Sequence, residues 1–225
     1  PGPVQVPDRV LEALARPNDT HRSEAYEEMH QIAVEGLKKL LYTENECFIM
    51  TCSATGIMEA CVRNLLDKDE KGLFFSIGAF GDRWYNVGLD NGKNAIKSSV
   101  EWGMALKPEF VKEILSKDKY SVVFLQSNET STGVYNPIYE IVPIIKDYGA
   151  LVCVDATSSM AGVKIEVDKL EIDVCLASVQ KCLALPPGLA VCSVSEKALE
   201  KTKTVKNRGH YFDFLTYLKK NKSHQ

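Results

Sequence analysis

The chain has 225 residues, of which 45% are hydrophobic and 25% are charged, and its formal net charge is −3 at pH 7. This size and composition predict one large domain with a substantial core, or one domain and part of another. The weak negative charge provides no basic face for nucleic acid. No apolar run is long enough to span a membrane, and the first residues do not resemble a signal peptide, so we expect a cytoplasmic protein.

The seven cysteines include no C-x-x-C pair, and most of them lie inside apolar runs. This pattern predicts neither a disulfide framework nor a metal site, and it fits a reducing compartment. The four histidines are scattered along the chain, and surface or structural positions are expected for them. We therefore predict no metal ligands.

Helix and strand patterns alternate along the chain. Residues 7–15 predict a short helix with proline in its first turn, and residues 23–41 predict a long amphipathic helix capped by Ser23. Short apolar runs predict buried strands at 47–51, 73–77, 95–100, 122–126, 151–154, 174–177 and 189–194. Helical patterns lie between most of them, at 56–66, 108–115 and 137–148. The alternation predicts an α/β fold with a mainly parallel sheet flanked by helices.

Two charged residues stand at the carboxyl ends of predicted buried strands. Asp155 directly follows the run 151–154, and Lys181 lies shortly after the run 174–177. Open α/β sheets bind ligands at this edge, and a buried charge is costly without a partner. Pyridoxal phosphate requires a lysine amine and a carboxylate for its ring nitrogen, so it is one ligand that explains both residues. A structural ion pair is the alternative.

A possible anion site follows the first predicted strand. In the turn Ser53-Ala54-Thr55-Gly56, hydroxyl side chains and free backbone N–H groups meet at the positive end of a predicted helix. An ordinary helix cap explains the same residues. Phe80 lies just after the strand that is predicted to end near residue 77. Its ring either packs in the core or stacks on a flat ligand.

Several strings of residues match one family in order and spacing. They are Pro1-Gly2-Pro3, residues 51–56, Asn128-Glu129-Thr130-Ser131-Thr132-Gly133, residues 155–159, Gln180-Lys181 and Pro186-Pro187-Gly188-Leu189-Ala190. Together they resemble the class V aminotransferases, specifically the alanine–glyoxylate and serine–pyruvate branch, over nearly the whole chain. The resemblance implies the large domain of a fold type I pyridoxal-phosphate enzyme.

The resemblance also implies the roles of particular residues. Lys181 would bond covalently to pyridoxal 5′-phosphate and act in catalysis, and Asp155 would keep the ring nitrogen protonated. The other residues assigned to the cofactor are Ser53, Ala54 through its backbone, Thr55, Gln180, Phe80 as the stacking ring, Thr130 at the phenolic oxygen, and Thr157. Ser159 is assigned to the substrate.

One position departs from the family's pattern. The family commonly has Gly-Ser-Gln-Lys where this chain has Ser178-Val179-Gln180-Lys181, so Val179 lacks the expected hydroxyl. We expect that Ser178 does not simply replace it, because adjacent side chains of an extended segment point to opposite sides. Phosphate affinity would then be lower, or another group would compensate. Gln180 argues against the cysteine desulfurase branch, which has a histidine immediately before its lysine.

The resemblance predicts an aminotransferase that moves an amino group from alanine or serine to glyoxylate or pyruvate, as a homodimer that binds neither nucleic acid nor membrane. We assign residues 1–21 to an N-terminal segment and residues 22–225 to the large cofactor-binding domain. The small C-terminal domain, with the arginine that grips the substrate carboxylate, would lie beyond Gln225. We therefore expect no robust turnover by the 225-residue chain alone.

Other functions stay open at this point. One is a catalytically silent aminotransferase-like module that acts by binding, and another is a different class V enzyme such as a cysteine desulfurase-type lyase. A nucleotide-binding doubly wound domain is the weakest alternative, because neither G-x-x-x-x-G-K-[ST] nor G-x-G-x-x-G follows any predicted strand.

Overall fold

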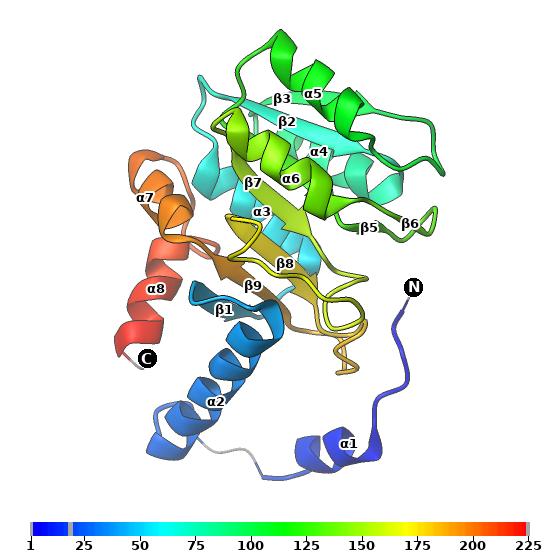
Figure 1. The fold of residues 1–225 in the computed structure, drawn as a ribbon. Helices are drawn as coiled ribbons and strands as arrows, with labels where there is room; N and C mark the ends of the chain where they lie inside the picture. Colours follow the sequence, from blue (N-terminus) through cyan, green and yellow to red (C-terminus); the bar gives the residue numbers. More distant parts are fainter. Residues whose placement is uncertain (1, 18–19, 224–225) are drawn as a thin grey trace.

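A seven-stranded mixed sheet is the centre of the computed structural model, which describes residues 2–17 and 20–223 (Figure 1). In spatial order its strands are β1 (Glu46–Met50), β9 (Ala190–Val194), β8 (Val174–Ser178), β7 (Leu151–Asp155), β4 (Val122–Gln126), β2 (Lys71–Ser76) and β3 (Asn94–Ser99). Strand β9 runs antiparallel to its two neighbours, and the other strands are parallel to one another. Two short strands, β5 (Asn128–Glu129) and β6 (Val134–Tyr135), form a separate hairpin.

Helices cover both faces of the sheet, which is why the central strands are continuously apolar. The helices are α1 (Asp8–Leu14), α2 (Glu24–Leu41), α3 (Ala54–Leu65), α4 (Ala79–Asp90), α5 (Pro108–Lys117), α6 (Ile138–Asp147), α7 (Glu196–Thr204) and α8 (Phe214–Ser223). Apolar residues of α2, α5 and α6 pack on one face, and those of α3, α4, α7 and α8 pack on the other (Figure 1). No helix in the described ranges is long and apolar enough to cross a membrane.

The predicted α/β fold with a mainly parallel sheet is confirmed. Each predicted strand forms within two residues of its expected bounds, and Ser23 caps α2 by accepting the Tyr26 N–H at 3.2 Å. The hairpin β5–β6 and the helices α7 and α8 were not predicted. Helix α1 has no buried residue, and the division of the chain after residue 21 stays a prediction.

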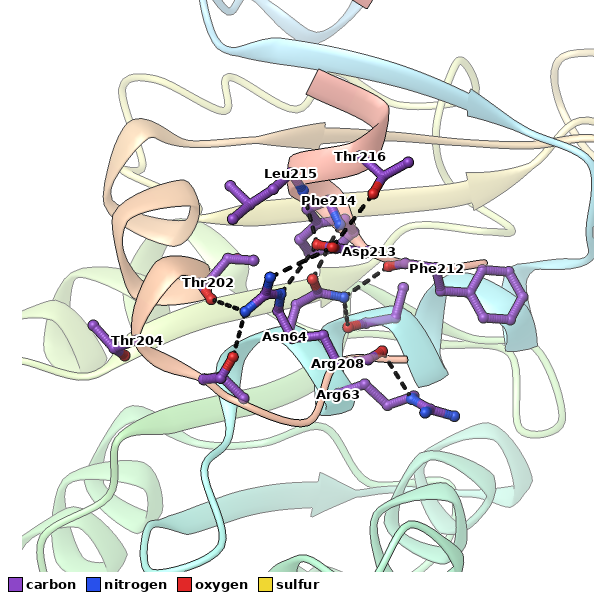
Figure 2. Close-up of polar contacts among 12 residues, drawn as sticks. Arg63, Asn64, Thr202, Thr204, Arg208, Phe212, Asp213, Phe214, Leu215 and Thr216 are labelled. Atoms are coloured by element: carbon purple, nitrogen blue, oxygen red, sulfur yellow. Dashed lines mark hydrogen bonds and ion pairs between the residues drawn. The ribbon is translucent and has the colours of Figure 1, made fainter. Parts of the chain in front are cut away.

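A buried amide joins the C-terminal segment to α3 (Figure 2). The Asn64 Nδ2 donates to the carbonyls of Ala60 and Phe212, at 2.8 Å each, and its Oδ1 accepts the Phe214 N–H at 3.0 Å. Asn64 is fully buried, so water cannot take its place as the hydrogen-bond partner of these backbone groups. This side chain therefore fixes the start of α8 against α3.

Arg208 holds the loop between α7 and α8 (Figure 2). Its guanidinium donates to the carbonyl of Thr202 at 3.1 Å and to that of Val205, and it forms an ion pair with Asp213 at 3.1 Å. In the other direction, Arg63 Nε on α3 donates to the Arg208 carbonyl at 3.0 Å. The loop is thus tied to α3, the helix that begins at the predicted anion turn.

We predict that Asn64→Ala lowers the free energy of unfolding by about 2 to 4 kcal/mol, because it leaves the Phe212 carbonyl and the Phe214 N–H buried without partners. Urea unfolding followed by circular dichroism measures this change. Asn86→Ala, at an exposed position of α4, is the matched control and should change stability by less than about 0.5 kcal/mol. Equal effects of the two substitutions would contradict the assigned role of Asn64.

Candidate active site

The predicted site residues come together at one edge of the sheet. The strand register aligns Met50 with Ala190, Ala190 with Ser178, and Gln126 with Asp155. Apart from Ala190, which begins the antiparallel strand β9, these residues stand at the carboxyl ends of the parallel strands β1, β8, β4 and β7, where open α/β sheets bind ligands. The segments that leave these ends, and that of β2, contain the predicted anion turn, Phe80, the residues after Asp155, and Lys181.

Asp155 is a buried carboxyl at the end of β7. It is 3% exposed, and its Oδ1 accepts the backbone N–H of Thr157 at 2.9 Å. Burial disfavours the charged form and raises the pKa of Asp155 to about 6, although the bonds from Thr157 oppose this change. Within the described residues no cation pairs with Asp155, so the structure contains no ion pair between Asp155 and Lys181.

Lys181 lies under the N-terminal segment. Its Nζ donates to the Gly2 carbonyl at 3.3 Å, and the Val4 N–H donates to the Gln180 carbonyl at 3.2 Å. A Cβ atom on Gly2 would lie 2.9 Å from Lys181 Cδ and 3.0 Å from the Gln180 oxygen. Only glycine therefore allows the segment to approach the half-buried lysine this closely.

The turn at the start of α3 has the hydroxyl groups that the sequence predicts, but one of its amides is engaged. Ser53 is exposed at the N-cap, and its side chain makes no capping bond. The Ala54 N–H donates to the Ser178 Oγ at 2.6 Å. In this structure the Ala54 amide is therefore already paired with a serine of β8, and its assignment to the phosphate stays a prediction. Thr55 is half-buried in the first turn of α3.

The arrangement around Val179 also differs from the expectation. Adjacent side chains do point to opposite faces of β8, but Ser178 is the one that faces α3. Val179 is 2% exposed and packs in the core on the other face of the sheet. A hydroxyl is therefore present at the α3 turn, supplied by the residue that we expected not to provide it.

Phe80 is half-buried in the first turn of α4, and the Arg83 guanidinium lies 4.7 Å from the centre of its ring. The N-cap of this helix is Gly78, which has no side chain to satisfy the first amides. Glu129 does so instead: its Oε2 accepts the N–H groups of Phe80 at 3.0 Å and of Gly81 at 3.1 Å. Glu129 therefore fixes the backbone that positions Phe80.

Sequence reasoning did not identify Glu129 or Ser131 as site-building residues. The Glu129 Oε1 accepts from the backbone N–H of Ser131 at 3.0 Å and from its Oγ at 2.7 Å, and the Ser131 Oγ in turn accepts the Ala79 N–H at 2.9 Å. A Cβ on Gly78 would lie 2.5 Å from both Glu129 Cγ and Ser131 Oγ. The sequence did contain a signal for this pair. Gly78 lies between the end of β2 and the start of a helix, and Glu129 lies in the polar loop that follows β4.

The two serines of the loop after Asp155 lie in different surroundings. The Thr130 Oγ1 and the Asn128 Nδ2 each donate to the Ser158 Oγ at 2.8 Å. Ser159, which we assigned to the substrate, is 4% exposed. Its hydroxyl forms hydrogen bonds with the Ser127 hydroxyl and the Ala156 carbonyl. The assignment of Ser159 to the substrate is not supported by this geometry, because its hydroxyl stabilises the loop from within.

Comparison with known proteins decides the family. Residues 2–224 match the family model described as aminotransferase class-V. The chain belongs to the class V aminotransferase family. Its members share pyridoxal-phosphate fold type I, and the sheet described above is the large domain of that fold.

Three relatives illustrate the likeness. The chain is 45% identical to an uncharacterized aminotransferase of Methanocaldococcus jannaschii, over 97% of the chain and 57% of that protein. It is 37% identical to the soluble hydrogenase 42 kDa subunit of Anabaena cylindrica, over 97% and 58%. It is 34% identical to the serine–glyoxylate aminotransferase of Methylorubrum extorquens, over 98% and 58%. The chain thus spans less than two thirds of the length of these relatives.

Two solved structures show the same arrangement. An aspartate aminotransferase of subgroup IV from Thermus thermophilus superposes with a TM-score of 0.92 at 33% identity, over 100% of this chain and 63% of that one. An alanine–glyoxylate aminotransferase from Nostoc sp. superposes with a TM-score of 0.94 at 26% identity, over 98% and 59%. The fold prediction is therefore confirmed by relatives of known structure.

We predict that Glu129→Gln destabilises the class V chain by about 2 to 4 kcal/mol, because one acceptor oxygen becomes an NH₂ group that faces amide donors. Thermal and urea unfolding measure the loss. Glu101→Gln, which removes one charge from an exposed residue, is the control and should be close to neutral. If Glu129→Gln were as stable as this control, Glu129 would not be the cap of α4.

The raised pKa of Asp155 predicts a pH-dependent stability. Between about pH 4 and pH 6 the folded protein retains a proton that the unfolded chain has lost, so the free energy of unfolding falls as the pH rises. The total loss is about 3 kcal/mol, and it persists above pH 6.

Asp155→Asn keeps an acceptor for the Thr157 N–H but cannot ionise. Without cofactor, its stability relative to the wild type should therefore rise by about 2.4 kcal/mol between pH 4 and pH 7. Urea unfolding at the two pH values measures this difference, and Asp147→Asn, which removes an exposed carboxyl, controls for the loss of one charge. A parallel pH dependence of wild type and Asp155→Asn would contradict the prediction.

Proposed function

We propose that this chain is the cofactor-binding part of a pyridoxal-phosphate-dependent aminotransferase that moves an amino group from serine or alanine to glyoxylate or pyruvate. The main support is the buried Asp155 carboxyl, which has no cation partner in the described chain, at the sheet edge that also bears the amine of Lys181. The serine–glyoxylate and alanine–glyoxylate relatives support the choice of small substrates.

The residues at this edge fit pyridoxal phosphate. Gln126 aligns with Asp155 on the neighbouring strand, and its Nε2 is buried without a hydrogen-bond partner in the described residues, which favours a polar ligand beside it. Ser53 and the positive end of α3 suit a phosphate group. When bound, pyridoxal phosphate supplies an electron-accepting ring for an amino acid that loses its α proton.

Each role proposed for the chain's own residues follows from its chemistry. Lys181 would hold the cofactor covalently through its Nζ, and its amine, when free, would accept the proton from the substrate's Cα. The Asp155 carboxylate holds a proton on the ring nitrogen, since an opposite charge favours the protonated form. Phe80 offers the flat apolar surface against the ring.

The remaining cofactor contacts are proposed for the phosphate and the phenolic oxygen. We propose Ser53, Thr55 and Gln180 for the phosphate and Thr130 for the phenolic oxygen; in this structure the Thr130 hydroxyl donates to the Ser158 Oγ at 2.8 Å. Thr157 anchors the Asp155 carboxyl through its backbone N–H. We propose a homodimer as the active form.

A second candidate is an aminotransferase-like subunit that acts by association and does not transfer amino groups. The observation that favours it is the likeness to the soluble hydrogenase 42 kDa subunit of Anabaena cylindrica, which is named for an assembly. The two candidates differ in whether Lys181 reacts with the cofactor and whether the natural-length protein turns over.

We predict that borohydride reduction of the natural-length protein with pyridoxal 5′-phosphate labels the peptide that contains Lys181. Lys181→Ala should lose the label and the associated absorbance band, and Lys112→Ala, at an exposed position of α5, should keep both. Peptide mapping by mass spectrometry measures the site. Label on another lysine would contradict the assignment.

The same preparation tests the reaction. Serine or alanine with glyoxylate or pyruvate should give turnover that Lys181→Ala abolishes. Specific labelling of Lys181 with no turnover on any of these pairs would favour the second candidate over the proposed substrates.

A further inference from the structure

We propose that Gln126 is a positioning residue of the candidate active site, and that its side-chain amide donates to the Asp155 carboxylate and orients it toward a cationic ring nitrogen. This inference rests on the proposed function, because it concerns the carboxylate that we assign to the cofactor. The sequence pattern alone identifies Gln126 only as the last residue of a buried strand.

Gln126 and Asp155 lie side by side at the ends of two adjacent strands. They are register partners on the parallel strands β4 and β7, and neighbouring strands lie about 4.8 Å apart, so a glutamine amide on one strand reaches a carboxyl on the next. Side chains alternate along a strand, and Phe124 and Cys153, two residues earlier, both belong to the core beneath α3 and α4. Gln126 and Asp155 therefore point to that same face.

The first turn of α4 closes over the Gln126 amide. Gln126 is 1% exposed, and a Cβ atom on Gly81 would lie 2.9 Å from its Oε1 and 2.6 Å from the Ser76 Cα. Glycine at position 81 thus lets the helix lie directly on the ends of β2 and β4. The amide nitrogen is enclosed as well, so bulk water cannot serve as its partner.

An unmatched donor and an acceptor with spare capacity stand next to each other here. The Gln126 Nε2 has two hydrogens, and within the described residues it has no acceptor. The nearby Glu129 already accepts from two amides of α4 and twice from Ser131. Asp155 accepts the Thr157 N–H, whereas a carboxylate can accept about four hydrogen bonds. Gln126 and Asp155 are not bonded in this structure, and a rotation about the Gln126 side-chain bonds joins them.

A donor at this position favours the charged form of Asp155. Burial raises the pKa of Asp155 to about 6, and hydrogen bonds donated to a carboxylate oppose that change. Thr157 donates from the following loop and Gln126 from the neighbouring strand, so the two donors together fix the orientation of the carboxylate. Gln126 thus contributes to binding a polar ligand through Asp155 and not through a contact of its own.

Four other groups act on the ionisation of Asp155. Glu129 disfavours its charge, and Arg83 on α4 favours it. The thiols of Cys61 on α3 and Cys175 on β8 also lie near, and burial raises the pKa of both, so they stay uncharged at neutral and acidic pH. Because variants of Gln126 leave these four groups in place, their influence is common to every protein in the test.

Carbon NMR of the natural-length protein without cofactor tests this contact. With aspartate labelled at its side-chain carboxyl carbon, the signal that is missing from Asp155→Asn belongs to Asp155, and its shift with pH gives the midpoint of ionisation. We expect Gln126→Met, which keeps the length of the side chain but removes the donor, to raise this midpoint by about one pH unit, because a charge-assisted hydrogen bond is lost. In the wild type, the side-chain amide protons of Gln126 should titrate with the same midpoint.

The role toward the cofactor has its own readout. Binding of pyridoxal 5′-phosphate, followed by absorbance, should weaken toward acid pH as Asp155 takes up its proton. In Gln126→Met this acid limb should move upward by the same amount as the midpoint, because the ring nitrogen requires the ionised carboxylate.

Two further variants complete the experiment. Ser76→Ala removes another fully buried donor, at the end of β2, whose bonds go to the Gly78 carbonyl and to Asp82, so it should leave the midpoint unchanged. Gln126→Glu has the shape of glutamine but replaces the donor with a second acid, and it should also raise the midpoint. It gives the readout if Gln126→Met does not fold.

An unchanged midpoint in the Gln126 variants, or an equal rise in Ser76→Ala, would overturn the role of Gln126 and leave the proposed function intact. A raised midpoint without a shift of the acid limb would overturn the role toward the ring nitrogen. If pyridoxal 5′-phosphate does not react with Lys181 in the wild type, the proposed function fails, and the positioning role fails with it even where the midpoint moves.

Discussion

Two helices begin at the carboxyl edge of the sheet without a capping side chain of their own, and their first amides are satisfied by other parts of the chain. Ser178 of β8 accepts from the start of α3, and Glu129 and Ser131 accept from the start of α4. An unsatisfied buried amide is expensive, so these bonds fix where each helix starts relative to the strands. The predicted anion turn and Phe80 take their positions from this constraint.

The same edge contains groups that do not favour the cofactor-free fold. Asp155 is buried and forms no ion pair within the described chain, and Gln126 Nε2 is buried without an acceptor. Buried polar groups without partners are typical of functional sites, where a ligand supplies the missing charge or hydrogen-bond partner. The surrounding structure, including the Asn64 amide that joins α8 to α3, supplies the stability that tolerates them.

Local sequence patterns predicted the strands well because β4, β8 and β9 are buried throughout and the other strands, apart from the edge strand β3, are mostly buried. They also placed Asp155 and Lys181 at strand ends. They could not predict contacts between distant residues: the bond between Ala54 and Ser178 joins positions 124 apart, and those from Glu129 to α4 join positions almost 50 apart. Likewise, nothing local distinguishes Ser158 from Ser159, because the loop's path decides which hydroxyl is buried.

The position of β1 has a consequence for how the molecule is synthesised. Strand β1 lies at the edge of the sheet and pairs with β9, so the strand that leads into the α3 turn has no neighbour in the sheet until β9, much later in the sequence, has been synthesised. The parallel strands β2, β4 and β7 can pair with one another before β9 has been synthesised. Because contacts between distant residues form late, we expect the anion turn to be assembled after the parallel strands β2, β4 and β7 have paired. A nascent chain that lacks β9 has no complete phosphate site, and a ligand of that site stabilises only chains that have folded past it.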